Sequence, residues 1–270
     1  MSDPREPAPV LQTRLESTDD IRRWSQQAGG TPPDAQRAVA AYRPTLRPPL
    51  AMLCIVDDGQ DTGQWVRMRG DSLVIGRAEG DVRIPHDRAI SNRHAEVVRA
   101  AEGGEWRWTL RDLKSTNGTF VRVTRTPLRD GQELILGGRR YRFQSVAASA
   151  EAAAAPVRDA TQAWQAPAVA AAAPQRWFVE LTAEGEGRRL PIEGDDTWIG
   201  SDASRCALVI ENDPFVNPQH AHLYRDPRGQ WLLETPAARN GTWLRIEQVT
   251  LQAPTSEFMT GEQRFIVRVP

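Results

Sequence analysis

The chain has 270 residues and a mass of 30.1 kDa, which is enough for two ordinary domains. Hydrophobic residues make up 40% and charged residues 26%, values that are typical of a soluble globular protein. The formal net charge of -1 provides no overall basic field, so the composition argues against nucleic acid or an anionic membrane as the partner.

The N-terminal segment, residues 1–50, is rich in Pro, Ala, Gln and charge and has few clustered apolar residues. We expect a mostly irregular, partly disordered extension with a short helix over 18–24, capped by Ser17 or Thr18. The segment lacks the apolar core of a signal peptide, and no stretch of the chain is long and apolar enough for a membrane span. The two cysteines, Cys54 and Cys206, are expected to be reduced thiols of a cytoplasmic protein.

Short apolar runs separated by turn residues fill the segment 51–146 and predict many antiparallel strands. The runs lie at 51–56, 64–68, 73–75, 95–98, 106–110, 119–123, 133–136 and 141–143. No long amphipathic pattern interrupts them, which favours a β-sandwich.

The same plan returns at 175–270, after a stretch rich in Ala and Pro at 147–174 that we interpret as a linker. Gly76, His94 and the triplet 117–119 recur about 123–126 residues later as Gly200, His220 and the triplet 240–242. Strand-like runs in this half lie at 176–181, 188–192, 197–199, 221–224, 231–234 and 242–246. We therefore predict an all-β protein of two antiparallel β-sandwiches, a first repeat at 51–146 and a second at 175–270.

Three segments of the first repeat combine side chains that suit a phosphate group. A guanidinium can donate two hydrogen bonds to two phosphate oxygens, and hydroxyl groups can donate to the remaining oxygens. Amide groups can form hydrogen bonds with the main chain of a ligand. The three segments are Ile75-Gly76-Arg77, Ile90-Ser91-Asn92-Arg93-His94 and Leu113-Lys114-Ser115-Thr116-Asn117-Gly118-Thr119. Because loops at one end of a sandwich can converge, these groups are expected to share one surface.

In these segments the first repeat resembles the forkhead-associated (FHA) domain, whose pattern is Gly-Arg, then Ser-x-x-His, then Asn-Gly-Thr. The resemblance implies an eleven-stranded sandwich that binds phosphothreonine peptides through loops at one end. It implies that the phosphate contacts are Arg77, Ser91, Asn92 and Thr116. It further implies that Asn117 binds the peptide backbone and that Gly76, His94 and Gly118 are structural.

The second repeat keeps the FHA frame but loses most of the expected contacts. Ser201 stands at the position of the phosphate-binding arginine, and Asn217 and Pro218 stand at those of the serine and asparagine. Arg239 occupies the threonine position, whereas Asn240 is retained. We expect this degenerate repeat to be a protein-interaction or self-association surface, with anion binding through Arg205 or Arg239 as the minority alternative.

The sequence thus predicts a phosphothreonine-binding signalling adaptor that is not an enzyme and needs no cofactor or metal. Ser91 and His94 lack the oxyanion device of a hydrolase, and no Cys pair or acidic cluster completes a metal site around His220 and His222. The expected partners are threonine-phosphorylated proteins and, in the same pathway, a Ser/Thr kinase. Two alternatives remain open, a phosphate-independent assembly protein and a regulatory subunit of an enzyme.

Overall fold

A computed structural model describes residues 48–145, 176–236 and 238–270 of the chain. Every regular element in these ranges is a β-strand, so the expected all-β class is confirmed. Within them there is no helix of the length and apolarity that would span a membrane. The helix expected near the N-terminus and the linker at 147–174 lie outside the described residues.

The first sandwich carries the Gly-Arg, Ser-x-x-His and Asn-Gly-Thr segments. One of its layers has the strand order β18-β6-β5-β3-β4, and the other has the order β7-β19-β20-β1-β2. Side chains alternate between buried and partly exposed along β3 and along most of β5, because one face of each strand packs on the core. The strands are β1 (Met52–Val56), β2 (Gly63–Arg67), β3 (Ser72–Gly76), β4 (Val82–Arg83), β5 (Ala95–Glu102), β6 (Glu105–Asp112), β7 (Thr119–Val123), β18 (Gln248–Thr250), β19 (Thr255–Thr260) and β20 (Gln263–Arg268).

The second sandwich has layers with the strand orders β14-β13-β15-β16-β8 and β12-β11-β10-β9-β17. An aromatic cluster of Phe143, Phe178 and Trp231 fills part of its core, with ring centroids about 6 Å apart. The strands are β8 (Arg125–Leu128), β9 (Glu133–Leu136), β10 (Arg139–Ser145), β11 (Arg176–Thr182), β12 (Gly185–Pro191), β13 (Asp196–Gly200), β14 (Leu208–Val209), β15 (Ala221–Arg225), β16 (Trp231–Glu234) and β17 (Thr242–Ile246).

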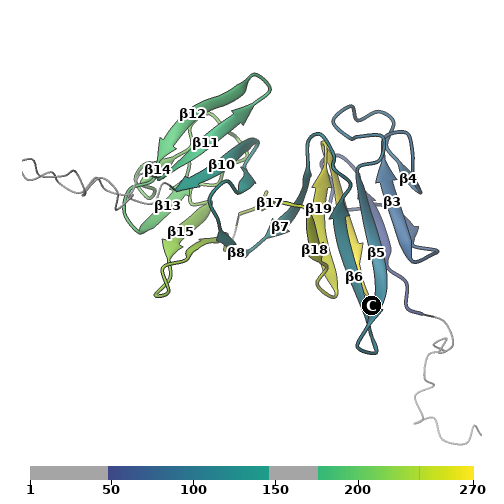
Figure 1. The fold of residues 1–270 in the computed structure, drawn as a ribbon. Helices are drawn as coiled ribbons and strands as arrows, with labels where there is room; N and C mark the ends of the chain where they lie inside the picture. The colour runs from purple at the N-terminus through teal and green to yellow at the C-terminus, as the bar shows by residue number, and fades with distance from the viewer. Residues whose placement is uncertain (1–47, 146–175, 237) are drawn as a thin grey trace, which may run out of the picture. The chain divides into compact units, whose positions relative to one another are not determined.

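The two repeats exchange their last three strands. Strands β18, β19 and β20 of the second repeat pair with β6, β7 and β1 of the first. In return, β8, β9 and β10 of the first repeat pair with β16, β17 and β11 of the second. Figure 1 shows the exchange by colour, with the yellow strands β18 and β19 beside the blue strands of the first repeat. Strands β7 and β17 also pair, so the layers that contain them form one continuous sheet.

The hydrophobic cores follow the exchange and not the sequence repeats. One core joins buried residues of 51–121 to Leu251, Phe258 and Phe265 of the second repeat. The other joins Leu134, Tyr141 and Phe143 of the first repeat to buried residues of 178–233. The repeats at 51–146 and 175–270 therefore do not coincide with the cores, because each core is completed by strands of the other repeat.

Most strands expected from apolar runs are present, but the end of the chain holds strands that the pattern did not predict. Strands β18, β19 and β20 were absent from the predicted set, as were the short strands β4 and β14 and the strand β8. Ten strands contribute to each sandwich within the described ranges, one fewer than the resemblance implied.

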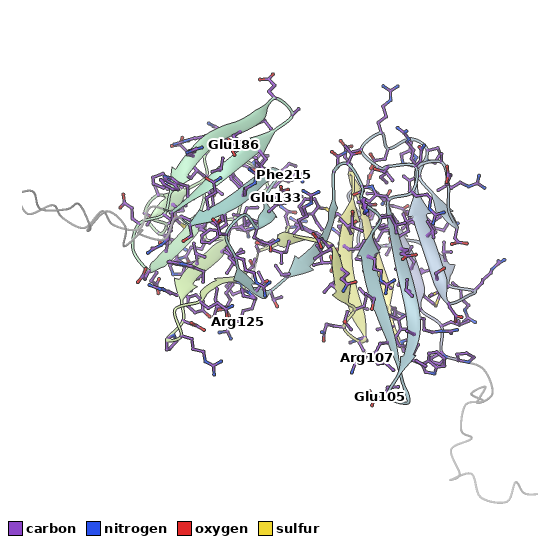
Figure 2. The ribbon with its side chains drawn as sticks, viewed as in Figure 1. Glu105, Arg107, Arg125, Glu133, Glu186 and Phe215 are labelled. Atoms are coloured by element: carbon purple, nitrogen blue, oxygen red, sulfur yellow. The ribbon has the colours of Figure 1, made fainter. Side chains whose placement is uncertain are left out.

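Ion pairs join the exchanged strands to their hosts in both sandwiches. In the first, Arg122 on β7 pairs with Glu257 on β19 at 3.0 Å. In the second, Arg245 on β17 pairs with Glu133 on β9 at 2.9 Å, and Arg140 pairs with the same carboxylate. Burial opposes ionisation of Glu133, but the hydrogen bonds and charges of the two arginines outweigh it and lower the pKa of this carboxyl. Figure 2 labels Glu133 in the second sandwich.

Candidate functional site

A tight corner at the end of β3 brings Arg77 against the loop that precedes β5, the Ser91 loop (residues 84–94). The Arg77 amide donates to the Ser91 carbonyl at 2.9 Å, and the Glu79 amide donates to the Asn92 carbonyl at 3.1 Å. A Cβ at Gly76 would lie only 2.0 Å from the Asn92 carbonyl oxygen. Glycine is therefore required before Arg77, because only a residue without a side chain allows the two backbones to approach this closely.

The Arg77 guanidinium is aligned beside Asn92, since its Nη2 donates to Asn92 Oδ1 at 3.1 Å. In the part of the chain that the structure describes, no carboxylate lies within ion-pairing distance of Arg77. The positive charge and the remaining N–H donors are thus available to an anion.

His94 is fully buried and stabilises the Ser91 loop from the core side. Its Nδ1 accepts a hydrogen bond from the Ser91 amide at 3.1 Å, so the proton lies on Nε2, which donates to the Gly118 carbonyl at 3.1 Å. Burial lowers the pKa of His94, although the bond to Gly118 and the charge of Asp112 oppose the shift. A neutral imidazole therefore ties the Ser91 loop to the loop before β7.

That second loop, the Asn117 loop (residues 113–118), contacts the Ser91 loop through two further hydrogen bonds. The Thr116 amide donates to Ser91 Oγ at 3.1 Å, and Asn117 Nδ2 donates to the Ala89 carbonyl at 2.8 Å. The five residues predicted to bind a ligand are thus brought together on two adjoining loops and one strand end. Together these residues carry a guanidinium, two hydroxyl groups and two amide side chains.

A carboxylate that sequence reasoning missed supports the Asn117 loop. Asp112, at the end of β6, accepts hydrogen bonds from the Ser115 amide at 2.9 Å and from the hydroxyls of Ser115 and Thr119 at 2.6 and 2.7 Å. The Ser115 hydroxyl in turn accepts from the Gly118 amide at 3.0 Å. An aspartate at a strand end followed by Ser and Thr is the sequence signal for such a network.

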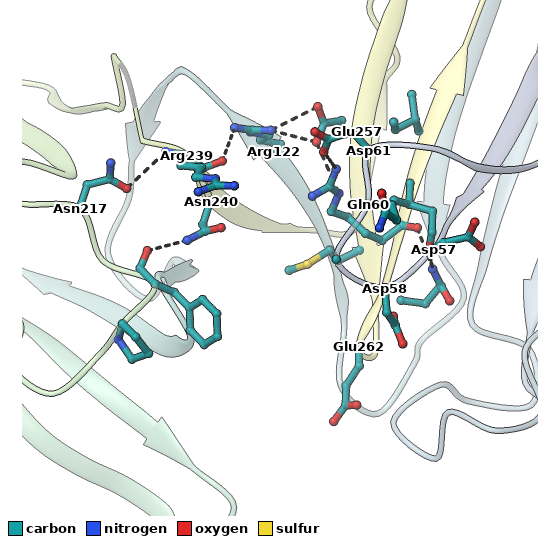
Figure 3. A pocket seen from close by; sticks show the side chains of 18 of the residues that line it. Asp57, Asp58, Gln60, Asp61, Arg122, Asn217, Arg239, Asn240, Glu257 and Glu262 are labelled. Atoms are coloured by element: carbon teal, nitrogen blue, oxygen red, sulfur yellow. Dashed lines mark hydrogen bonds and ion pairs between the residues drawn. The ribbon is translucent and has the colours of Figure 1, made fainter.

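The second repeat reproduces the frame of this site with other side chains. His220 accepts from the Asn217 amide at 3.2 Å and donates to the Gly241 carbonyl at 3.0 Å. The Arg239 amide donates to Asn217 Oδ1 at 3.3 Å, where the first repeat uses a serine hydroxyl. Figure 3 shows Asn217, Arg239 and Asn240, which line a polar cleft of about 950 Å³.

The second repeat has other residues at the positions of the predicted phosphate-binding donors. Ser201 replaces the arginine, and its hydroxyl donates to the Val216 carbonyl at 3.3 Å. Pro218 has no backbone N–H to offer. Thr235 and Ala238 stand at the positions of Asp112 and Ser115, so the carboxylate network of the first repeat is absent here.

No cluster of three or more His, Cys, Asp or Glu side chains suited to a metal ion occurs within 48–145, 176–236 or 238–270. His222 lies on the outer face of β15, stacked on Trp198 at 4.5 Å, whereas His220 is buried in the core. His220 precedes β15, which begins at Ala221, and its ring is hydrogen-bonded to the Asn217 amide and the Gly241 carbonyl and not directed toward His222.

The model of the FHA domain matches twice, at residues 73–137 and 197–256. The FHA domain-containing protein FhaB of two Mycobacterium tuberculosis strains is 34% identical over 71 residues, which cover 26% of this chain and 43% of FhaB. The match therefore spans less than half of that relative's length.

Several solved structures also resemble parts of the chain. One comes from a structural and functional analysis of phosphothreonine-dependent FHA domain interactions. Its sequence is 35% identical, and the match covers 30% of this chain and 81% of the solved chain, with a TM-score of 0.22. Full-length yeast Pml1p is 21% identical over 44% of this chain and 85% of its own, with a TM-score of 0.26. Mycobacterium tuberculosis EmbR in complex with a low-affinity phosphopeptide is 24% identical over 36% of this chain and 24% of its own, with a TM-score of 0.23.

Proposed function

Because the chain carries two repeats of the FHA domain family, we propose that it is a signalling adaptor that binds threonine-phosphorylated proteins through its first repeat. The observation that carries the proposal is the arrangement of Arg77, which has no carboxylate partner among the described residues, beside two hydrogen-bonded loops that carry two hydroxyl groups and two amide side chains. A phosphate brings about -1.5 to -2 charge and three strong acceptors, which these donors suit.

Each residue has a role in the proposed complex. Arg77 pairs with the phosphate through its planar fork, and Ser91, Asn92 and Thr116 donate to the remaining oxygens. Asn117 holds the peptide main chain beside the phosphothreonine. None of these roles requires a bond to be made or broken, so the proposed function is binding and not catalysis.

The proposal implies a Ser/Thr kinase that acts on the partner, and it places the adaptor in the cytoplasm with that kinase. The second repeat is proposed not to bind phosphothreonine, since Ser201 supplies no charge and Pro218 no amide donor. Its proposed roles are a protein-interaction or self-association surface and the completion of the first sandwich through β18–β20.

The direct test compares wild type with Arg77→Ala in titrations of a peptide library that has a fixed phosphothreonine. Removing one side of a desolvated charge pair costs about 2–5 kcal/mol, so the affinity is expected to fall by at least about tenfold. Isothermal calorimetry or fluorescence anisotropy on the full chain measures the change. The same peptides without phosphate are expected not to bind.

Arg205→Ala in the second repeat is the matched control, because it removes an exposed arginine beside the degenerate loops. Wild-type affinity is expected for this variant. Equal binding by wild type and Arg77→Ala would contradict the proposed site and favour a phosphate-independent assembly role. Loss of binding in Arg205→Ala alone would indicate that the phosphate site lies in the second repeat.

A further inference from the structure

The Ser91 loop contains a buried carboxylate that none of the proposed ligand contacts uses. Asp87 is only 8% exposed. Its Oδ1 accepts a hydrogen bond from the Ala89 amide at 2.8 Å, and its Oδ2 accepts one from the Glu262 amide at 2.7 Å. The second bond leaves the first repeat, because Glu262 lies in the turn between β19 and β20 of the second repeat.

The turn at 260–262 is packed directly against the loop at this point. Gly261 has a φ of +61°, a conformation that favours glycine. A Cβ on Gly261 would lie 2.5 Å from Asp87 Oδ2 and 2.8 Å from Ile90 Cγ1. Any side chain at position 261 would therefore push on the residue next to Ser91.

The segment from Asp87 to Ser91 is thus held at both ends. At one end Asp87 receives the Glu262 amide, and the Ile90 amide donates to the Asp87 carbonyl at 3.3 Å. In the middle, Asn117 Nδ2 donates to the Ala89 carbonyl, and at the other end the Thr116 amide donates to Ser91 Oγ. Because Ile90 is buried, the segment cannot shift without opening the core of the first sandwich.

We propose that the phosphothreonine site is completed by the second repeat, with Asp87 as a positioning residue that anchors the Ser91 loop to the turn at 260–262. This inference rests on the proposed function of the first repeat. It assigns the second repeat a defined part in that function, although its own loops lack the phosphate-binding residues. Ser91 and Asn92 keep their places relative to Arg77 because the turn at 260–262 of the second repeat holds the Ser91 loop at Asp87.

The second sandwich contains the equivalent contact with the roles of the two repeats reversed. This contact supplies a matched control. Asp213 accepts from the Phe215 amide at 2.9 Å and from the Gly138 amide at 2.9 Å. Gly137 has a φ of +63°, and a Cβ on it would lie 2.8 Å from Asp213 Oδ2. Here a turn of the first repeat braces the degenerate loop of the second.

The test measures phosphothreonine-peptide affinity in full-length Asp87→Ala, Asp87→Asn and Gly261→Ala, at a temperature where near-ultraviolet circular dichroism shows each variant folded. A loss of at least tenfold is expected for Asp87→Ala and Gly261→Ala. A smaller loss is expected for Asp87→Asn, because its side-chain oxygen still accepts one of the two hydrogen bonds. This mild variant keeps the test valid where alanine prevents folding.

The controls are Asp213→Ala and Gly137→Ala, which should lower the denaturation midpoint to a similar degree while the affinity stays within about twofold of wild type. Wild-type affinity in Asp87→Ala and Gly261→Ala would overturn the inference, as would an equal loss of affinity in the controls. A failure of the proposed function looks different, because wild type itself would then not distinguish phosphorylated from unmodified peptide.

Discussion

Phe265→Ala is expected to destabilise the sandwich that holds Arg77 by about 3–5 kcal/mol, although Phe265 belongs to the second repeat. The Phe265 ring is fully buried and stacks on Phe258 at a centroid distance of 5.0 Å. Both rings lie on exchanged strands and pack in the core formed by β1–β7. Truncation removes most of the buried ring and leaves a cavity that a close-packed core cannot fill.

Tyr141→Ala is the matched variant, since Tyr141 occupies the equivalent position of the first repeat and is 1% exposed in the second core. Amide hydrogen exchange resolves the two effects. Phe265→Ala should reduce protection mainly in β1, β3 and β5, and Tyr141→Ala mainly in β11, β13 and β15. The opposite assignment, with each variant destabilising its own repeat, would rule out the strand exchange.

Gly76→Ala is expected to abolish measurable phosphothreonine binding. The new Cβ would lie 2.0 Å from the Asn92 carbonyl and 2.5 Å from the Glu79 carbonyl. Both neighbours are backbone atoms, so relief of the overlap requires the strand end and the Ser91 loop to separate. That movement displaces Arg77 from Ser91, which its amide now contacts. Calorimetric titration with a phosphothreonine peptide measures the loss.

Gly200→Ala creates the same overlap in the second sandwich, where a Cβ would lie 2.1 Å from the Pro218 carbonyl. This control should unfold at a lower denaturant concentration than wild type yet retain most of its phosphopeptide affinity. Retention of full affinity by Gly76→Ala would contradict the claim that the close approach of the β3 end to the Ser91 loop positions Arg77.

The residues proposed to bind the ligand could be selected from the sequence because their types and order are specific. Arg77 follows a glycine at a strand end, and Ser91 precedes His94 by the spacing of one short turn. Asp87 and Asp112 escaped prediction because an aspartate in a polar loop is a common solvated residue. The contact of Asp87 with Glu262 joins segments that are far apart in the sequence, so no local pattern reveals it, whereas the Ser and Thr that follow Asp112 were a local signal that was overlooked.

The two sandwiches were predictable from turns and apolar runs, but the exchange was not. Strands β8–β10 and β18–β20 are equivalent segments of two repeats, so each set fits the gap that the other leaves. Tyr141 and Phe265 illustrate this, because both are large aromatic residues at the same place in the strand. Strand β19 carries Thr255, Ser256 and Glu257 and lacked the apolar run used to assign strands.

The central claim is that a phosphothreonine site of the first repeat lies in a sandwich completed by the second, and a cysteine crosslink tests it most directly. Cys54 on β1 lies opposite Ile266 on β20. Directly opposed residues of antiparallel strands have Cα atoms about 4.5–5.5 Å apart, within the range of a disulfide. Without exchange, the equivalent position on β10, Arg142, would face Cys54 instead.

The measurement is mass spectrometry of oxidised Ile266→Cys and Arg142→Cys chains, with phosphopeptide titration of the crosslinked monomer. We predict that Cys54 forms a disulfide within one chain only in Ile266→Cys, and that this locked chain binds phosphothreonine peptide with wild-type affinity. A crosslink only in Arg142→Cys, or a locked Ile266→Cys chain that no longer binds, would contradict the account.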